Sequence, residues 1–525
     1  MSPDSRIRPS AVALPRWIFA TSFTIAVVAL SVYAASAGVR GSDQYWYLAD
    51  VETLASGHGV VTNTVFPVGL LGPGGTLTPP FIHNVLSIYL ASLPATVVGP
   101  LGGWLVLNVG ASLATAWLIY LTARTVASEW AALICGVLYP LLPVTFWHVT
   151  QPLTEASTAL FAALAIFLLS VAGTQFTRWL ALVGAVGLLY ASRESYLPLL
   201  MAVPVGFLVV RAREQPGHLR RALAPTVGIV AAAIAVVVMA QVMFGADNVR
   251  FSYTRLLHTA VPGQTNNMWL NFDLSPSNLA DRLPFDVGLL VSKAVGHLAE
   301  QFVRFDSLPF ALFYWTFNIL TVVAFVMLWR CRHRPAQMRL VVAALSMVAI
   351  HGITLLLFQN QARYTVPALP GLLVVLAIAI SGIPVLAARI APRPLATAVV
   401  LAILALGPTY ALAQIERSDA FAYGQTQLAA QTLFEQYLAP SDTAMIVYDG
   451  TPQVLAYAAR PRTILYVSPD YKPADYKRLI AAFPTRWLLA PTVSRALDGL
   501  LRGSPTPVGT INALGQTWGL YRIGD

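Results

Sequence analysis

Long apolar runs separated by short polar segments occupy most of the chain, up to about residue 413. A run of about 17 to 25 apolar residues can cross a bilayer as a helix, and the runs near this length predict about eleven spans. Several are short or interrupted by proline. The expected spans are residues 17–39, 101–123, 130–149, 153–171, 179–191, 196–210, 225–244, 308–329, 340–358, 366–388 and 395–413.

Basic residues give these spans an orientation. With eleven spans, all of the arginine clusters fall on one side, which the positive-inside rule makes cytoplasmic. We therefore expect a multi-pass protein of the cell (plasma) membrane with its N-terminus in the cytoplasm. The clusters are Arg6, Arg8 and Arg16; Arg124; Arg178; Arg211, Arg213, Arg220 and Arg221; Arg330, Arg332, Arg334 and Arg339; and Arg389 and Arg393.

The remaining polar segments are then extracytoplasmic. They include two long outer loops, at about residues 40–100 and 245–307, and the tail after residue 413. In the first loop the Gly/Pro-rich run 67–80 favours irregular backbone. The apolar piece 83–93 that follows is either an interfacial helix or an extra span.

The tail, residues 414–525, has a different pattern. Short strand-like runs alternate with helix-like stretches, which is typical of a small α/β domain. The strand-like runs are 444–448, 463–467, 487–490 and 518–523, and the helix-like stretches are 453–459, 474–482 and 493–501. The expected fold class is therefore an all-α polytopic membrane protein, residues 1–413, with a small C-terminal α/β extracytoplasmic domain.

Composition agrees with a membrane protein. Of 525 residues, 57% are hydrophobic and 11% charged, with a mean hydropathy of +0.65, whereas soluble chains carry about 25% charged residues. The net charge of +10 could suit a nucleic-acid partner. Because most of the basic residues lie in short loops, where membrane orientation accounts for them, we expect no nucleic acid.

Asp43 lies just beyond the first span, where a carboxylate is costly unless it is wet, paired or used. It could act as a general base that takes the proton of an acceptor hydroxyl attacking a sugar carbon while a phosphate departs. Such chemistry needs one carboxylate and a cation to hold the departing charge. Alternatively, Asp43 only caps or solvates the end of the first helix.

Three further charged residues come from other outer turns and could converge with Asp43 on one cavity: Glu155, Arg193 and Arg363. Arg363, which Tyr364 follows, could bind a phosphate through bidentate charge-assisted hydrogen bonds. Either arginine could instead pair with an acid. Arg193 could pair with its neighbour Glu194 or with another carboxylate, and Arg363 could pair with an acid of the long loop.

Tyr45, Trp46 and Tyr47 follow Asp43 directly. The two tyrosines could line a substrate pocket, but Tyr and Trp are also common membrane-interface anchors, a role favoured for Trp46. His148, near an outer span end, is a further pocket candidate.

The histidines lack the close spacing of a metal site such as His-x-x-x-His, which favours ordinary loop polar residues. A divalent cation held by Asp43 and a histidine stays open, and no other cofactor is indicated. The histidines concerned are His58, His83, His148 and His258.

Together these features resemble the membrane glycosyltransferases of the GT-C class, in the branch of protein O-mannosyltransferases and lipid A aminoarabinose transferases. The acidic motif and downstream tyrosine that follow the first helix in that family are matched by residues 43–47 and the later 57–59. The family's Arg-Tyr-x-x-Pro resembles residues 363–367. Many members have a second acid where this chain has Gln44, which puts any acidic pair in doubt. Asp50 and Glu52 could substitute for it.

The resemblance implies an inverting transfer of a sugar from a polyprenyl-phosphate donor, held among membrane lipid, to a hydroxyl on the outer face. The acceptor would be a protein, a lipid or a cell-wall glycan. Asp43 would be the base, and Arg363 and Arg193 would bind the donor phosphate. The other expected pocket residues are Tyr45, Tyr47, Glu155, His148 and Tyr364.

Two alternatives stay open. A lipid-linked sugar flippase or another transporter would place functional charges deep in both halves of the membrane region, around a midplane site. A polysaccharide polymerase would share the lipid-linked substrate.

Overall fold

The computed structural model describes residues 16–36, 38–39, 43–58, 63–67, 86–214, 219–244, 287–303, 308–357, 362–382, 420–449, 452–494, 497, 506–513 and 515–523. The expected span at 395–413 lies outside the described residues. So do almost all of the Gly/Pro-rich run 67–80 and most of the helix-like stretch 493–501.

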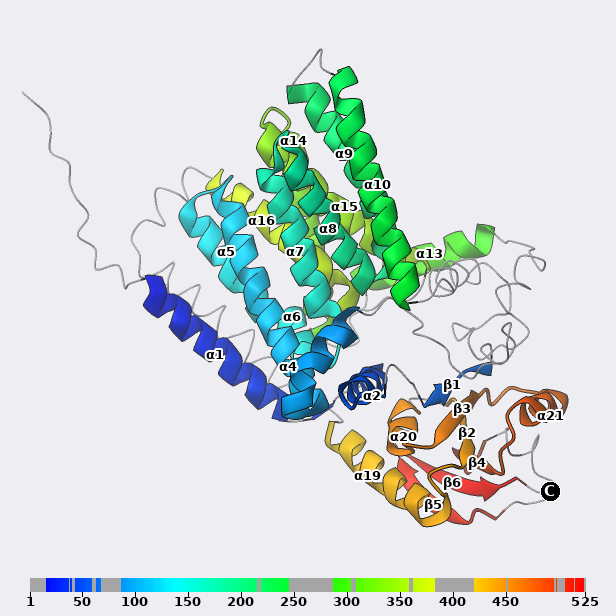
Figure 1. Ribbon diagram of the computed structural model, residues 1–525. Coiled ribbons are helices and arrows are strands. Elements are labelled where there is room, and N and C mark those ends of the chain that lie inside the picture. Colours follow the sequence, from blue (N-terminus) through cyan, green and yellow to red (C-terminus); the bar gives the residue numbers. More distant parts are fainter. Residues whose placement is uncertain are drawn as a thin grey trace, which may run out of the picture.

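Every other expected span coincides with an apolar helix (Figure 1). Among the described residues, six helices are long and apolar enough to cross a membrane, or seven if the bent pair α5 and α6 forms one span. The chain is thus a multi-pass membrane protein, and the count of eleven spans stays a prediction. The helices are α1 (Arg16–Ser36), α4 (Leu86–Arg124), α5 (Glu129–Leu141), α6 (Pro143–Val149), α7 (Glu155–Ala172), α8 (Phe176–Ser192), α9 (Leu197–Glu214), α10 (Leu219–Phe244), α14 (Leu308–Arg330), α15 (Pro335–Leu357) and α16 (Leu369–Ser381).

The apolar piece expected at 83–93 is helical from Leu86 and forms the first part of α4. Gly99, with φ of 77°, breaks the helix there, a conformation that glycine adopts without steric cost. Beyond the break, the two parts of α4 pack closely at Gly103, where an added Cβ would lie 2.5 Å from the carbonyl oxygen of Ala91. The piece is therefore a helical arm joined to the second span across a kink.

The two outer loops contain helices that the sequence pattern did not predict, α2 (Asp43–Ala55) and α13 (Val287–Val303). In α2, Tyr45, Leu48, Ala49 and Val51 are buried, a spacing that gives a short helix a continuous apolar side. Asp43 begins the helix, where a carboxylate complements the positive end of the helix dipole.

The tail forms most of a six-stranded sheet with the order β1-β3-β2-β4-β6-β5. The expected strands and the helix-like stretches 453–459 and 474–482 are present, and β5 is additional. The strands β1, β3, β2 and β4 run parallel to one another, while β6 runs antiparallel to both of its neighbours, β4 and β5. The elements are β1 (Thr64–Val65), β2 (Thr443–Val447), β3 (Thr463–Val467), β4 (Trp487–Pro491), β5 (Gly509–Ala513) and β6 (Gln516–Arg522), with α19 (Ala420–Tyr437), α20 (Gln453–Ala458) and α21 (Pro473–Ala482). Because β1 comes from the first outer loop, the sheet is not confined to the tail.

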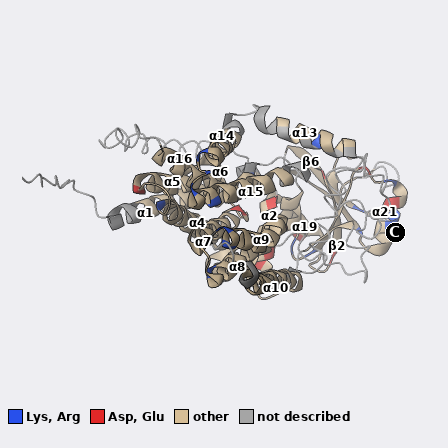
Figure 2. Cartoon of the chain, turned by 90° about the horizontal axis from the view of Figure 1, so that it is seen from above, with Lys and Arg blue, Asp and Glu red and all other residues tan. Residues whose placement is uncertain are grey.

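Successive strand residues face opposite sides of this sheet. Met445 and Leu465 face α21, whereas Ile446 and Tyr466 belong to a core shared with α19, α20, α2 and the first part of α4. Two perpendicular views place α2 between the mostly uncharged helical bundle and the sheet (Figures 1 and 2).

This placement corrects the anchor role expected for Trp46. Its ring packs edge-on against Phe66 and Tyr466, with centroid separations of 5.7 and 6.3 Å. Trp46 is therefore part of the packing between α2 and the sheet.

The close approach inside α4 gives a test with a control in the same helix. Gly103→Ala should lower the thermal unfolding midpoint in detergent, because overpacking costs about 1–3 kcal/mol. Gly110→Ala, where an added Cβ meets nothing within 4 Å, should leave the midpoint unchanged or raise it slightly. Equal midpoints for the two variants would contradict the close packing.

Candidate active site

Four charged residues from distant parts of the chain meet at the end of the bundle that faces α2. Asp43 begins α2, and Glu155 begins α7. Arg193 lies between α8 and the 3₁₀ turn Glu194–Tyr196, and Arg363 belongs to the 3₁₀ segment Ala362–Ala368 before α16. Each lies at a helix end, so the spans themselves bring the four side chains together.

Asp43 and Arg363 form the shortest contact of this cluster. The Arg363 guanidinium donates a hydrogen bond of 2.8 Å to Asp43 Oδ2 across 320 residues of sequence. The Asp43 side chain is 35% exposed, compared with 15% for Arg363. Asp43 is thus held from one side by a cation while part of its carboxylate stays accessible.

Glu155 lies deeper and bridges both arginines. Its Oε1 is 3.6 Å from Arg193 and 3.7 Å from Arg363, and its side chain is 2% exposed. These are ion pairs, since the distances exceed those of good hydrogen bonds. Glu155 Oε2 and Arg363 Nε have no hydrogen-bond partner among the described residues. The cluster therefore balances two negative with two positive charges and keeps unused polar atoms.

Tyr364 lies against both arginines. The guanidinium carbons of Arg193 and Arg363 are 4.5 and 5.3 Å from the centre of its ring, within the range of a cation–π contact. The phenol oxygen lies 3.5 Å from Arg363. Tyr364 thus helps to fix the two guanidinium groups relative to each other.

The two tyrosines of α2 have different surroundings. Tyr47, one helical turn after Asp43, lies close enough to all four charges to interact with them electrostatically, and burial raises its pKa. Its ring contacts Trp104 at 5.9 Å. Tyr45 instead packs against Tyr457, at 5.3 Å between ring centres. Tyr47 therefore joins the charged cluster, and Tyr45 joins the core that α2 shares with the sheet.

His148 is buried in α6, and its Nδ1 lies 2.5 Å from the carbonyl oxygen of Val144, one turn earlier. A carbonyl only accepts, so Nδ1 carries the proton of this hydrogen bond. This contact lies within α6 itself.

A divalent cation at this site would have to bind the carboxylates of Asp43 and Glu155. Within the described residues, no group of three or more His, Cys, Asp or Glu side chains could hold a metal ion. Asp43 and Glu155 face guanidinium groups instead, and positive charge at those positions opposes a bound cation. The described residues do not fit a metal site here.

The sequence did not indicate a second polar contact on α2. Glu52 accepts hydrogen bonds from Arg460, at 2.5 Å, and from the Tyr457 hydroxyl, at 3.0 Å. Tyr457 and Arg460 lie about 400 residues after Glu52 in the sequence, and no local pattern indicates that the two segments meet. Nearby, burial raises the pKa of Asp50 to about 7, although Arg460 opposes part of this rise.

The described residues therefore define a multi-pass membrane protein with a charged cluster at one end of its bundle and a small sheet beside it. Neither a protein-family model nor a curated protein sequence matches the chain. Solved structures do match its fold.

The oligosaccharyltransferase AglB from Archaeoglobus fulgidus, in complex with an inhibitory peptide and a dolichol-phosphate, aligns over 91% of this chain and 70% of its own, with a TM-score of 0.53 and 12% identity. An Archaeoglobus fulgidus oligosaccharyltransferase in the apo form aligns over 90% of this chain and 70% of its own, with a TM-score of 0.52 and 14% identity. ArnT from Cupriavidus metallidurans, bound to undecaprenyl phosphate, aligns over 97% and 98%, with a TM-score of only 0.45 and 14% identity. The expected GT-C resemblance is confirmed for the fold.

The raised pKa of Asp50 predicts a pH-dependent stability. The folded-state pKa lies above the unfolded value of about 3.9, so ionisation of Asp50 destabilises the fold fully above about pH 7 and not at all below about pH 4. Asp50→Asn should raise the unfolding midpoint at pH 8 by about 2 °C or more. The difference from the parent should shrink as the pH falls and vanish near pH 4. The exposed Asp470→Asn is the control, and a midpoint for Asp50→Asn that follows the parent at every pH would contradict the assignment.

Proposed function

We propose that this protein is an integral membrane glycosyltransferase that moves a sugar from a polyprenyl-phosphate donor to a hydroxyl acceptor on the extracytoplasmic face, with inversion. The observation that carries the proposal is the meeting of Asp43 with Arg363 on a GT-C fold. An accessible carboxylate and a phosphate-binding cation side by side are what this transfer needs.

In the proposed reaction Asp43 is the general base. The acceptor oxygen forms a bond to the anomeric carbon, its proton passes to the Asp43 carboxylate, and the carbon–oxygen bond to the donor phosphate breaks with its electron pair on the phosphate. The exposure of Asp43 supports this role, because the acceptor hydroxyl must reach the carboxylate directly. Glu155, at 2% exposed, is too enclosed for it.

The departing phosphate would be held by Arg363 and Arg193. Each guanidinium has five N–H donors in a fixed plane, and Arg363 Nε has no hydrogen-bond partner among the described residues. Glu155 and Tyr364 would keep both groups aligned. A protein of the same fold, AglB, is seen with dolichol-phosphate, which supports a polyprenyl phosphate as the donor lipid.

We place the cluster on the extracytoplasmic side. Arg211 and Arg213, which are expected in the cytoplasm, end α9, and this helix begins at the other end beside Arg193. The apolar donor would then enter from the bilayer, which is its natural solvent. The sheet lies at the same end of the bundle as α2 (Figure 1).

The direct test is Asp43→Asn, which keeps the shape of the side chain and removes the base. Purified parent and variant would be incubated with radiolabelled polyprenyl-phosphate sugars and a crude envelope fraction, and release of polyprenyl phosphate would be followed. The variant should lose activity about a hundredfold to ten-thousandfold and still bind undecaprenyl phosphate. Asp470→Asn, an exposed acid in the tail, should behave like the parent.

Equal turnover by the parent and Asp43→Asn would refute the base assignment. Movement of the labelled lipid across a bilayer without any release of polyprenyl phosphate would instead support a flippase.

A second substitution tests the phosphate ligand. Arg363→Lys keeps the charge but loses the planar fork, so kcat/KM for the donor should fall about tenfold or more, the effect of one lost charge-assisted hydrogen bond. Arg334→Gln, in the loop between α14 and α15, removes an exposed arginine far from the cluster and should leave kcat/KM unchanged. An Arg363→Lys enzyme with parental kcat/KM would remove Arg363 from the donor site.

A further inference from the structure

The helix that carries Asp43 is held both by α4 and by the sheet region. One side of α2 meets α4, where Trp104 Nε1 donates a hydrogen bond of 3.3 Å to the carbonyl oxygen of Tyr47. The other side meets the sheet and its helices through aromatic packing, which includes Tyr45 against Tyr457. The helix thus lies between two bodies, and both limit where Asp43 can be.

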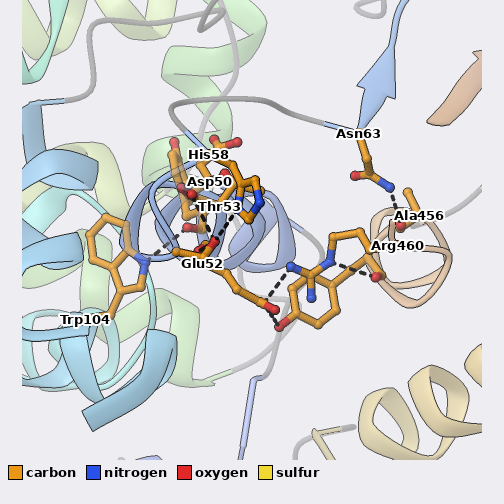
Figure 3. Close-up of polar contacts among 11 residues, drawn as sticks. Asp50, Glu52, Thr53, His58, Asn63, Trp104, Ala456 and Arg460 are labelled. Carbon is orange, nitrogen blue, oxygen red and sulfur yellow. Dashed lines mark hydrogen bonds and ion pairs between the residues drawn. The ribbon is translucent and has the colours of Figure 1, made fainter. Parts of the chain in front are cut away.

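At the end of α2 opposite Asp43, three polar groups form a clamp, defined here as Glu52, Tyr457 and Arg460. Figure 3 shows Glu52 and Arg460 in contact. Arg460 donates to Glu52 at 2.5 Å and to the carbonyl oxygen of Tyr457 at 3.0 Å. Its guanidinium carbon lies 3.6 Å from the centre of the Tyr457 ring. Burial raises the pKa of Tyr457 to about 12, so its hydroxyl stays protonated and donates to Glu52.

The segment after α2 is attached to the same region. The Asn63 amide donates two hydrogen bonds of 3.0 Å, to the carbonyl oxygens of Ala456 and Arg462, and one of them appears in Figure 3. Two residues of β1 then pair in parallel with β3. The chain that leaves α2 is therefore fixed to α20 and the edge of the sheet.

Asp43 and Glu52 are nine residues apart, which corresponds to about 13.5 Å along a helix. A rigid helix transmits a displacement at one end to the other, so release of Glu52 would move Asp43 relative to Arg363. Their present contact is a single hydrogen bond of 2.8 Å, and a shift of about 1 Å in a reacting group can cost a hundredfold in rate.

We propose that Arg460 is a positioning residue: through Glu52 and Tyr457, the sheet region clamps α2 and sets the position of Asp43 at the charged cluster. The inference rests on the proposed function, and it gives the C-terminal sheet a role in the reaction that does not require it to touch substrate.

The clamp is partly exposed, with side chains 18% exposed for Arg460 and 44% for Glu52. A partly exposed ion pair of this kind makes a small contribution to stability. The expected changes in hydrogen exchange and turnover are therefore moderate. Matched control variants are needed, because a general loss of folding would also speed exchange and lower turnover.

The experiment compares Glu52→Gln, Arg460→Met and the double variant with the parent in detergent. Hydrogen exchange of residues 43–55 reports the opening of α2, and donor turnover reports kcat and KM separately. Each single variant should speed exchange in α2, but not in α7, about two- to fivefold. The kcat should fall by a similar factor while the donor KM stays unchanged. The double variant should exchange no faster in α2, and have no lower kcat, than either single variant. The charge-reversed pair Glu52→Arg with Arg460→Glu should recover part of the exchange protection and part of the kcat.

Lys477→Met removes an exposed cation from α21, away from α2, and should match the parent. Parental exchange in α2 for both single variants would refute the clamp. Faster exchange with parental kcat would refute the positioning role. A parent that exchanges as expected but turns over no donor would refute the proposed function alone, since the exchange arm still decides whether the clamp exists.

Discussion

The ion pair between Asp43 and Arg363 is the constraint on which the arrangement of this end of the bundle depends. It joins the first helix outside the first span to the segment that leads into α16, 320 residues later. A carboxylate at the end of a membrane span is costly when unpaired, and so is a guanidinium. Glu155, Arg193 and Tyr364 extend the contact into a balanced cluster. Four helix ends must therefore stay in register for any of these charges to be satisfied.

The spans and most strands could be predicted from the sequence, because their signal lies within each segment. A run of apolar residues marks a helix in lipid wherever its neighbours are, and β2 and β3 lie where short apolar runs predicted strands. The convergence of Asp43, Glu155 and Arg363 was also expected, from their common side of the membrane. Their pairing was not, because orientation alone does not say which acid meets which arginine.

The missed features depend on contacts between distant segments. The helix α2 follows a span directly and mixes buried apolar residues with three acids, so its pattern resembled a polar loop. The strand β1 has only two residues, and its pairing with β3 carries no local signal. Glu52 and Arg460 are separated by 408 residues, and each resembles an ordinary surface charge. Trp46 was assigned to the membrane interface because the packing of α2 on the sheet cannot be read from composition.

A physical reason links the missed features to the site. Between helices in lipid the hydrophobic effect gives no driving force, since lipid tails are as apolar as the side chains. Outside the lipid it acts fully, and there Tyr45, Leu48 and Val51 of α2 share a core with the sheet. The same core contains Ile88 and Trp104 of α4, so α2 is fixed from the side of the sheet as well as from the side of α4. In the proposed transferase, this packing would give the base on α2 a well-defined position relative to a donor held in lipid.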